Sequence, residues 1–162
     1  NFGDGGDQNI ARKNVRDAID RNADLDTLVG IWSYNAPAIV DIVTQLKRRK
    51  DFTIVTFDAE PVAIDHMKKG MIDAMAVQNP HAMGYEGVRM LRALIKDDKA
   101  ALAEMEKRMS RSEEKDLFDT GLKIIIPDEG SPLADVQFGD NTNKLTLSKF
   151  TEWLKSKGLQ GS

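Results

Sequence analysis

The fold is decided by residues 52–80, which read FTIVTFDAEPVAIDHMKKGMIDAMAVQNP. The short apolar run 52–57 predicts a β-strand. A helix is predicted over 62–69, with Gly70 at the position that follows its last turn, and the apolar run 72–77 predicts a second strand. A strand, a helix and a second strand in this order predict a right-handed crossover between parallel strands.

The same alternation continues on both sides of this unit. Residues 27–32 (TLVGIW) form an apolar run without alternation, as expected for a strand buried on both faces. A long loop is predicted over 128–144, where Gly, Asp, Asn and Pro are frequent, and residues 160–162 are expected to be a frayed end. The other predicted elements are helices over 8–21, 36–48, 82–96 and 147–157, an amphipathic helix within 96–115, and a strand over 122–126.

Two of these helices carry recognisable local signals. Asp7 is expected to cap the first helix, because its carboxylate can accept hydrogen bonds from the first free backbone N–H groups. The helix over 82–96 carries an apolar stripe, which we expect to pack tightly against the rest of the protein. The stripe consists of Gly84, Val88, Leu91 and Ile95.

Composition excludes several classes of function. The 162 residues carry a net charge of −3 and show no basic stripe, so a nucleic-acid-binding role is not expected for this segment. The absence of cysteine excludes disulfides, thiol nucleophiles and cysteine-ligated metals, and two histidines leave little for another metal site. No apolar run is long enough to span a membrane. Residues 1–7 contain no signal peptide, which is equally true of a mature exported protein or a fragment.

Three predicted strands end in polar residues, namely Asn35, Asp58 and Gln78. Ligands of open α/β sheets bind outside the carboxyl ends of the strands, and parallel strands bring those ends to one edge. Amide and carboxylate groups can bond two neighbouring hydroxyls at once. Asp58 could instead cap the helix that follows it. We therefore expect Asn35, Asp58 and Gln78 to share a rim suited to a polar small molecule.

Aromatic residues adjoin these polar positions. Aromatic faces pack well against the C–H face of a sugar ring. For Trp32 we favour a place in the core over a role in binding, whereas the position of Tyr34 suits both equally.

No motif of a nucleophile elbow, a phosphate-binding loop or a dinucleotide-binding turn is present, so an enzyme is not expected.

The order of several short motifs resembles a known family. The motifs are Asn14-Val15, 30–35 (GIWSYN), 54–58 (IVTFD), 69–74 (KGMIDA), 77–80 (VQNP) and 83–85 (MGY). Over about residues 7–96 the chain resembles the C-terminal half of periplasmic sugar-binding proteins of the ribose-binding type. These proteins are the solute receptors of ABC transporters, and they share a fold with the effector domains of LacI-type repressors.

The resemblance implies a fold and a division of the chain. The fold is α/β, with a doubly wound, mostly parallel sheet that forms an incomplete lobe of a type I periplasmic binding protein. Residues 1–78 would form part of the C-terminal lobe, and 79–126 would hold hinge crossings and helices that belong to the N-terminal lobe. Residues 127–162 would be a loop and a helix that return to the C-terminal lobe. The N-terminal lobe and the first βα unit of the C-terminal lobe would otherwise be missing from the sequence.

The resemblance also implies a function. Asn35, Asp58 and Gln78 would bond the hydroxyls of a monosaccharide or related polyol, without a cofactor, and Tyr34 is a further candidate contact. The family often has Gly after the Phe-Asp pair and Asp after the Asn, whereas this chain has Ala59-Glu60 and Ala36, so Glu60 becomes an additional candidate. The closed protein would deliver its sugar to the permease of an ABC transporter from the periplasm, or from a lipid-anchored extracytoplasmic position. Alternatives are the effector domain of a LacI-type regulator and an α/β enzyme with an unrecognised site.

Overall fold

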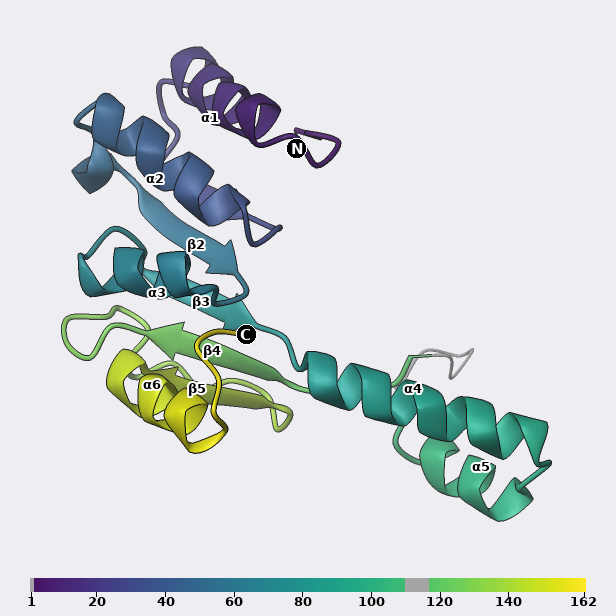
Figure 1. The fold of residues 1–162 in the computed structure, drawn as a ribbon. Helices are drawn as coiled ribbons and strands as arrows, with labels where there is room; N and C mark the ends of the chain where they lie inside the picture. Colours follow the sequence, from purple (N-terminus) through teal and green to yellow (C-terminus); the bar gives the residue numbers. More distant parts are fainter. Residues whose placement is uncertain (1, 110–116) are drawn as a thin grey trace.

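The computed structural model describes residues 2–109 and 117–162, and it contains a five-stranded sheet with helices packed against it (Figure 1). The elements are α1 (Gln8–Arg21), β1 (Thr27–Gly30), α2 (Asn35–Gln45), a 3-10 turn (Arg49–Asp51), β2 (Thr53–Phe57), α3 (Pro61–Lys68), β3 (Ala74–Val77), α4 (Pro80–Ile95), α5 (Lys99–Glu106), β4 (Leu122–Ile126), β5 (Thr142–Thr146) and α6 (Leu147–Ser156).

The strands lie in the order β1-β2-β3-β4-β5. β1, β2 and β3 are parallel, with Gly30 opposite Thr56 and Phe57 opposite Ala76. β4 is antiparallel to β3, and β5 is parallel to β4. The predicted α/β fold with a mostly parallel sheet is therefore confirmed, and the crossover unit predicted from residues 52–80 is present as β2, α3 and β3.

Two sequence predictions about strands are wrong. The apolar run 27–32 forms a strand only as far as Gly30, and Val29 is 54% exposed, because β1 is at the edge of the sheet and pairs only with β2 in the part described. The predicted loop over 128–144 overlaps β5, whose residues Thr142–Thr146 are mostly polar and half-buried. Their pairing with β4 outweighs the weak strand signal of this sequence.

The core lies between the sheet and the helices. Asp7 caps α1 as predicted, since its carboxylate accepts hydrogen bonds from the backbone N–H groups of Asn9 and Ile10. α2 packs against α1 and α3, and α6 packs against α3, β4 and β5. The largest fully buried side chains include Phe150, Ile54, Ile72, Met75, Ile125 and Leu154.

α4 and α5 extend away from the sheet as a helical pair (Figure 1). The predicted amphipathic helix corresponds to α5, and residues 110–115 of that prediction lie outside the described residues. The stripe on α4 does not pack as expected, because Val88, Leu91 and Ile95 are 67%, 60% and 82% exposed. α4 therefore presents an apolar surface to solvent. No helix in the described part of the chain combines the length and the hydropathy of a membrane span.

Candidate functional site

The carboxyl ends of β1, β2 and β3 lie at one edge of the sheet because these strands are parallel and neighbouring. Asp58 directly follows β2, Gln78 directly follows β3, and Asn35 is the first residue of α2, five positions after β1. The backbone N–H of Asp58 donates to the carbonyl of Ala76 at 2.8 Å. The three residues therefore occupy one edge, as the sequence predicts.

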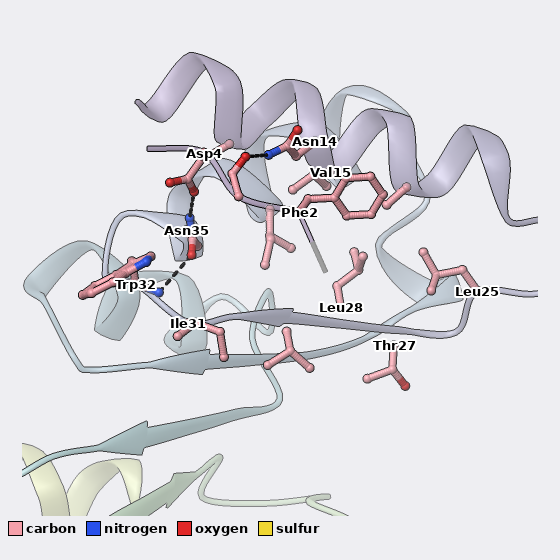
Figure 2. Close-up of a pocket in the computed structure, with 15 residues that line it drawn as sticks. Phe2, Asp4, Asn14, Val15, Leu25, Thr27, Leu28, Ile31, Trp32 and Asn35 are labelled. Carbon is pink, nitrogen blue, oxygen red and sulfur yellow. Dashed lines mark hydrogen bonds between the residues drawn. The ribbon is translucent and has the colours of Figure 1, made fainter. Parts of the chain in front are cut away.

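The side chain of Asn35 is held by two hydrogen bonds (Figure 2). Its Oδ1 accepts from the backbone N–H of Trp32 at 2.9 Å, and its Nδ2 donates to Asp4 at 3.1 Å. Tyr34 donates its hydroxyl proton to the same carboxylate at 2.6 Å. The two candidate residues that follow β1 are thus joined through Asp4.

Sequence reasoning missed Asp4. Residues 4–7 (DGGD) predict a glycine-rich turn followed by a helix cap, and the turn is present, with the backbone N–H of Asp7 donating to the carbonyl of Asp4 at 3.0 Å. Gly5 and Gly6 both have positive φ, which glycine adopts without steric cost. The local sequence signals the turn, but nothing in it signals side-chain partners about thirty residues away.

Asp58 has an unusual backbone and an unfavourable environment. Its φ is +60°, in the left-handed region that Asp tolerates better than most residues. Burial raises the pKa of its carboxyl group, and the nearby charge of Glu60 raises it further, whereas a hydrogen bond from the backbone N–H of Gln78 lowers it. A carboxylate kept in a position that disfavours its charge is a candidate functional group.

Glu60 and Gln78 are exposed at this edge, where they remain accessible to a ligand. Glu60 precedes α3 but makes no side-chain cap, and Asp58 does not cap this helix either. The chain end is adjacent, because Ala59 and Ser162 exchange backbone hydrogen bonds of 2.6 and 3.0 Å. The frayed end expected over 160–162 is therefore wrong.

Of the aromatic residues near this edge, Trp32 differs from expectation. Trp32 is 62% exposed, so its predicted place in the core is wrong. The reason is that the strand ends two residues earlier, which places Trp32 in the turn before α2. Tyr34 is half-buried, with its hydroxyl on Asp4, and Phe57 is half-buried at the end of β2.

A cavity lies beside this edge rather than at its centre. It has a volume of about 530 Å³ and lies between α1 and β1, where Phe2, Val15 and Leu28 form apolar walls (Figure 2). Asp4 and Asn35 line it, whereas Asp58 and Gln78 do not. Asn14, in its wall, donates to the carbonyl of Gly3 at 3.1 Å and so ties α1 to the N-terminal loop.

In the described part of the chain, no group of three His, Asp or Glu residues is arranged to hold a metal.

Gly30 supports the position of Asn35, and its replacement is a first test of the site. A Cβ at residue 30 would lie 2.9 Å from the Cβ of Asn35 and 3.1 Å from a methyl carbon of Ile39. We expect Gly30→Ala to lower the free energy of unfolding by about 1–3 kcal/mol, as overpacking does in other cores. Gly84→Ala is the control, because a Cβ there meets nothing within 4 Å. Equal urea midpoints for Gly30→Ala and wild type would contradict this packing.

Known proteins resemble the chain in sequence and fold. Residues 1–99 match the periplasmic binding protein domain family. GanP, a glucose-galactose binding protein from Geobacillus stearothermophilus, is 26% identical, with a TM-score of 0.54, over 57% of this chain and 33% of that protein. An ABC transporter solute-binding protein from Agrobacterium vitis, bound with α-D-tagatopyranose, is 29% identical, with a TM-score of 0.52, over 59% of this chain and 32% of that protein.

A third structure shows the same fold over more of the chain. A carbohydrate transporter solute-binding protein from Agrobacterium radiobacter, in complex with D-arabinose, is 19% identical, with a TM-score of 0.57, over 80% of this chain and 38% of that protein. No curated protein matches. The chain thus spans about a third of the length of these solved proteins. Because the family match covers residues 1–99, more than half of the sequence, the chain belongs to the periplasmic binding protein domain family.

Proposed function

We propose that this chain is part of a solute-binding protein that captures a monosaccharide between two lobes for an ABC transporter. The observation that carries the proposal is the shared edge of the sheet, where Asn35, Asp58 and Gln78 follow three neighbouring parallel strands. Amides and a carboxylate together supply the donors and acceptors that adjacent hydroxyls require. Tyr34, which follows β1, and Glu60, which follows β2, extend this set.

The division of the chain between two lobes is part of the proposal. Residues 1–78 and 127–162 would form one lobe, and 79–126 would cross to the other. Support comes from α4, which exposes Tyr85, Val88 and Leu91 although large apolar patches are uncommon on soluble monomers. An N-terminal lobe, which the proposal assigns to the rest of the protein, would cover this surface. It would also close over the edge that carries Asp58, as hinge-bending proteins do around ligands.

The partners follow from this role. A closed complex would be recognised by a membrane permease, which places the protein in the periplasm or on the outer side of the membrane. Two of the solved relatives described above hold D-arabinose and tagatopyranose, and a further solute-binding protein from Agrobacterium vitis with a similar fold holds D-fucose. Pentoses and hexoses are therefore the first candidates for the ligand. Binding needs no cofactor and no catalytic group, because hydrogen bonds and ring packing in a closed cleft are sufficient.

Calorimetric titration tests the function directly. The full-length protein and residues 1–162 alone would each be titrated with a panel of pentoses and hexoses that includes these three sugars. We expect at least one sugar to bind the full-length protein, and the isolated chain to bind the same sugar weakly or not at all, because half of the cleft is absent. Failure of every sugar to bind the full-length protein would contradict the proposal.

A further inference from the structure

Asp4 holds two candidate binding residues that belong to a different part of the chain. Its Oδ1 accepts from the hydroxyl of Tyr34 at 2.6 Å and from the backbone N–H of Gly6 at 3.0 Å, and its Oδ2 accepts from Asn35 at 3.1 Å (Figure 2 shows the last contact). We propose that Asp4 is a positioning residue of the sugar site, which orients Tyr34 and Asn35 for the ligand. This inference rests on the proposed function of the site.

These contacts use only half of the hydrogen-bonding capacity of the Asn35 side chain. An Asn side chain has two N–H donors and an oxygen with two acceptor positions. Asp4 takes one donor and the backbone N–H of Trp32 takes one acceptor position. One donor and one acceptor position therefore remain in a fixed orientation, which is the pair needed to bond two neighbouring hydroxyls. Without Asp4, the amide would lose the contact that prevents it from rotating.

The contact also decides how Tyr34 can act. Because its only hydroxyl proton points to Asp4, its oxygen can only accept a hydrogen bond from a ligand. The hydrogen bond from Tyr34 is the largest cause that lowers the pKa of Asp4, and the same contact raises the pKa of Tyr34. An ionised Asp4 and a neutral Tyr34 therefore stabilise each other over the neutral pH range.

Asp4 itself is well placed to remain fixed. The turn that contains Gly5 and Gly6 leads directly into α1, whose first turn is capped by Asp7. Asn14 of α1 holds the same loop through the carbonyl of Gly3. The carboxylate is thus anchored to a helix on one side, and it reaches the start of α2 on the other.

The first test measures the contact without any sugar. The chain has two tyrosines, so a Tyr85→Phe background leaves Tyr34 as the single phenol. Absorbance titration should show that Tyr34 ionises at a higher pH than an unperturbed tyrosine, and that Asp4→Asn lowers this pH. Far-ultraviolet circular dichroism would confirm that the protein remains folded at each pH. Ionisation at the same pH in both proteins would overturn the proposal.

The second test uses the sugar found to bind the full-length protein. We expect Asp4→Asn to weaken its binding by about tenfold, as the loss of a hydrogen bond to a charged group does. Tyr34→Phe should weaken binding as well, and the double variant should lose less than the product of the two single effects, because the residues act together. Independent effects, or an unchanged affinity of Asp4→Asn, would overturn the role of Asp4.

A matched control separates positioning from general stability. Asp128 accepts two hydrogen bonds from Ser148 at 2.8 and 3.0 Å, and it follows β4, which is antiparallel to β3, so it lies at the opposite edge of the sheet. Asp128→Asn should leave sugar affinity unchanged. If it weakens binding as much as Asp4→Asn, the effect is structural and the proposal fails. If wild type binds no sugar, the proposed function fails instead, while the tyrosine titration still tests the contact.

Discussion

Replacement of Asp58 by asparagine is expected to weaken sugar binding by about a hundredfold, because hydrogen bonds to a charged group contribute about 1.5–3 kcal/mol each and a carboxylate can accept several. Asn preserves the shape of the side chain and tolerates the left-handed backbone of this position, where φ is +60°. The measurement is calorimetric titration of the full-length protein with the sugar that binds wild type.

Two further variants isolate the carboxylate from its backbone. Asp58→Gly also tolerates a positive φ but removes the side chain, so it should bind no better than Asp58→Asn. Asp65→Asn changes an exposed carboxylate of α3, which accepts a hydrogen bond from Lys68 at 3.4 Å, and should leave affinity unchanged. Wild-type affinity in Asp58→Asn would remove Asp58 from the site.

The stability of Asp58→Asn should change in the opposite direction from its sugar affinity: the variant should be more stable than wild type at neutral pH. The pKa of Asp58 is raised in the folded protein, chiefly by burial, so the unfolded chain ionises this group at lower pH than the folded chain. Its contribution to stability is therefore largest in acid and is lost as pH rises through the raised pKa. At neutral pH, Asp58→Asn should unfold at a slightly higher urea concentration than wild type, and the difference should disappear in acid. A lower midpoint at neutral pH would show that the carboxylate stabilises the fold.

The strand ends could be predicted from the sequence because they depend on local patterns. The positions of Asp58 and Gln78 are predicted by two apolar runs, the helix between them and the polar residue that follows each run. None of these signals requires knowledge of distant contacts. The rule that parallel neighbours share an edge then brings Asn35 to the same rim. Each of these steps relates residues that are fewer than about thirty positions apart in the sequence. An error in the prediction of one element therefore does not change the prediction of the others.

The remaining features depend on contacts that local patterns do not contain. Val29 is exposed because β1 is at the edge of the sheet in the described part of the chain, and the position of a strand in a sheet is set by pairing between distant segments. β5 is a strand because β4 pairs with it, although its residues are mostly polar. Asp4 joins the site through side chains thirty and thirty-one positions away.

The wrong prediction of burial for the apolar stripe of α4 has a different cause from these errors. The periodicity of Val88, Leu91 and Ile95 correctly predicts a helix with an apolar face, but it cannot say whether the partner of that face is within the same 162 residues. In the described structure α5 covers only part of α4. This is why an amphipathic pattern predicts the helix more reliably than it predicts burial.

In contrast to the exposed stripe of α4, Phe150 is a buried apolar residue. Its replacement by alanine is expected to lower the free energy of unfolding by about 3–5 kcal/mol, as large-to-small changes do in other cores. Phe150 is 0% exposed and stacks on Trp153 with ring centroids 5.8 Å apart. It belongs to α6, which packs on α3, β4 and β5. The change would leave a cavity where the end of the chain closes the core, and urea unfolding of residues 1–162 measures it.

Leu91→Ala is the matched control, since Leu91 is also a large apolar residue of a helix but is 60% exposed. Its truncation should change the free energy of unfolding by no more than about 0.5 kcal/mol, as surface substitutions usually do. A small effect for Phe150→Ala would mean that α6 is not part of the cooperative unit. A large effect for Leu91→Ala in residues 1–162 would mean that α4 is buried in solution, and the surface that we assign to a second lobe would then already be occupied.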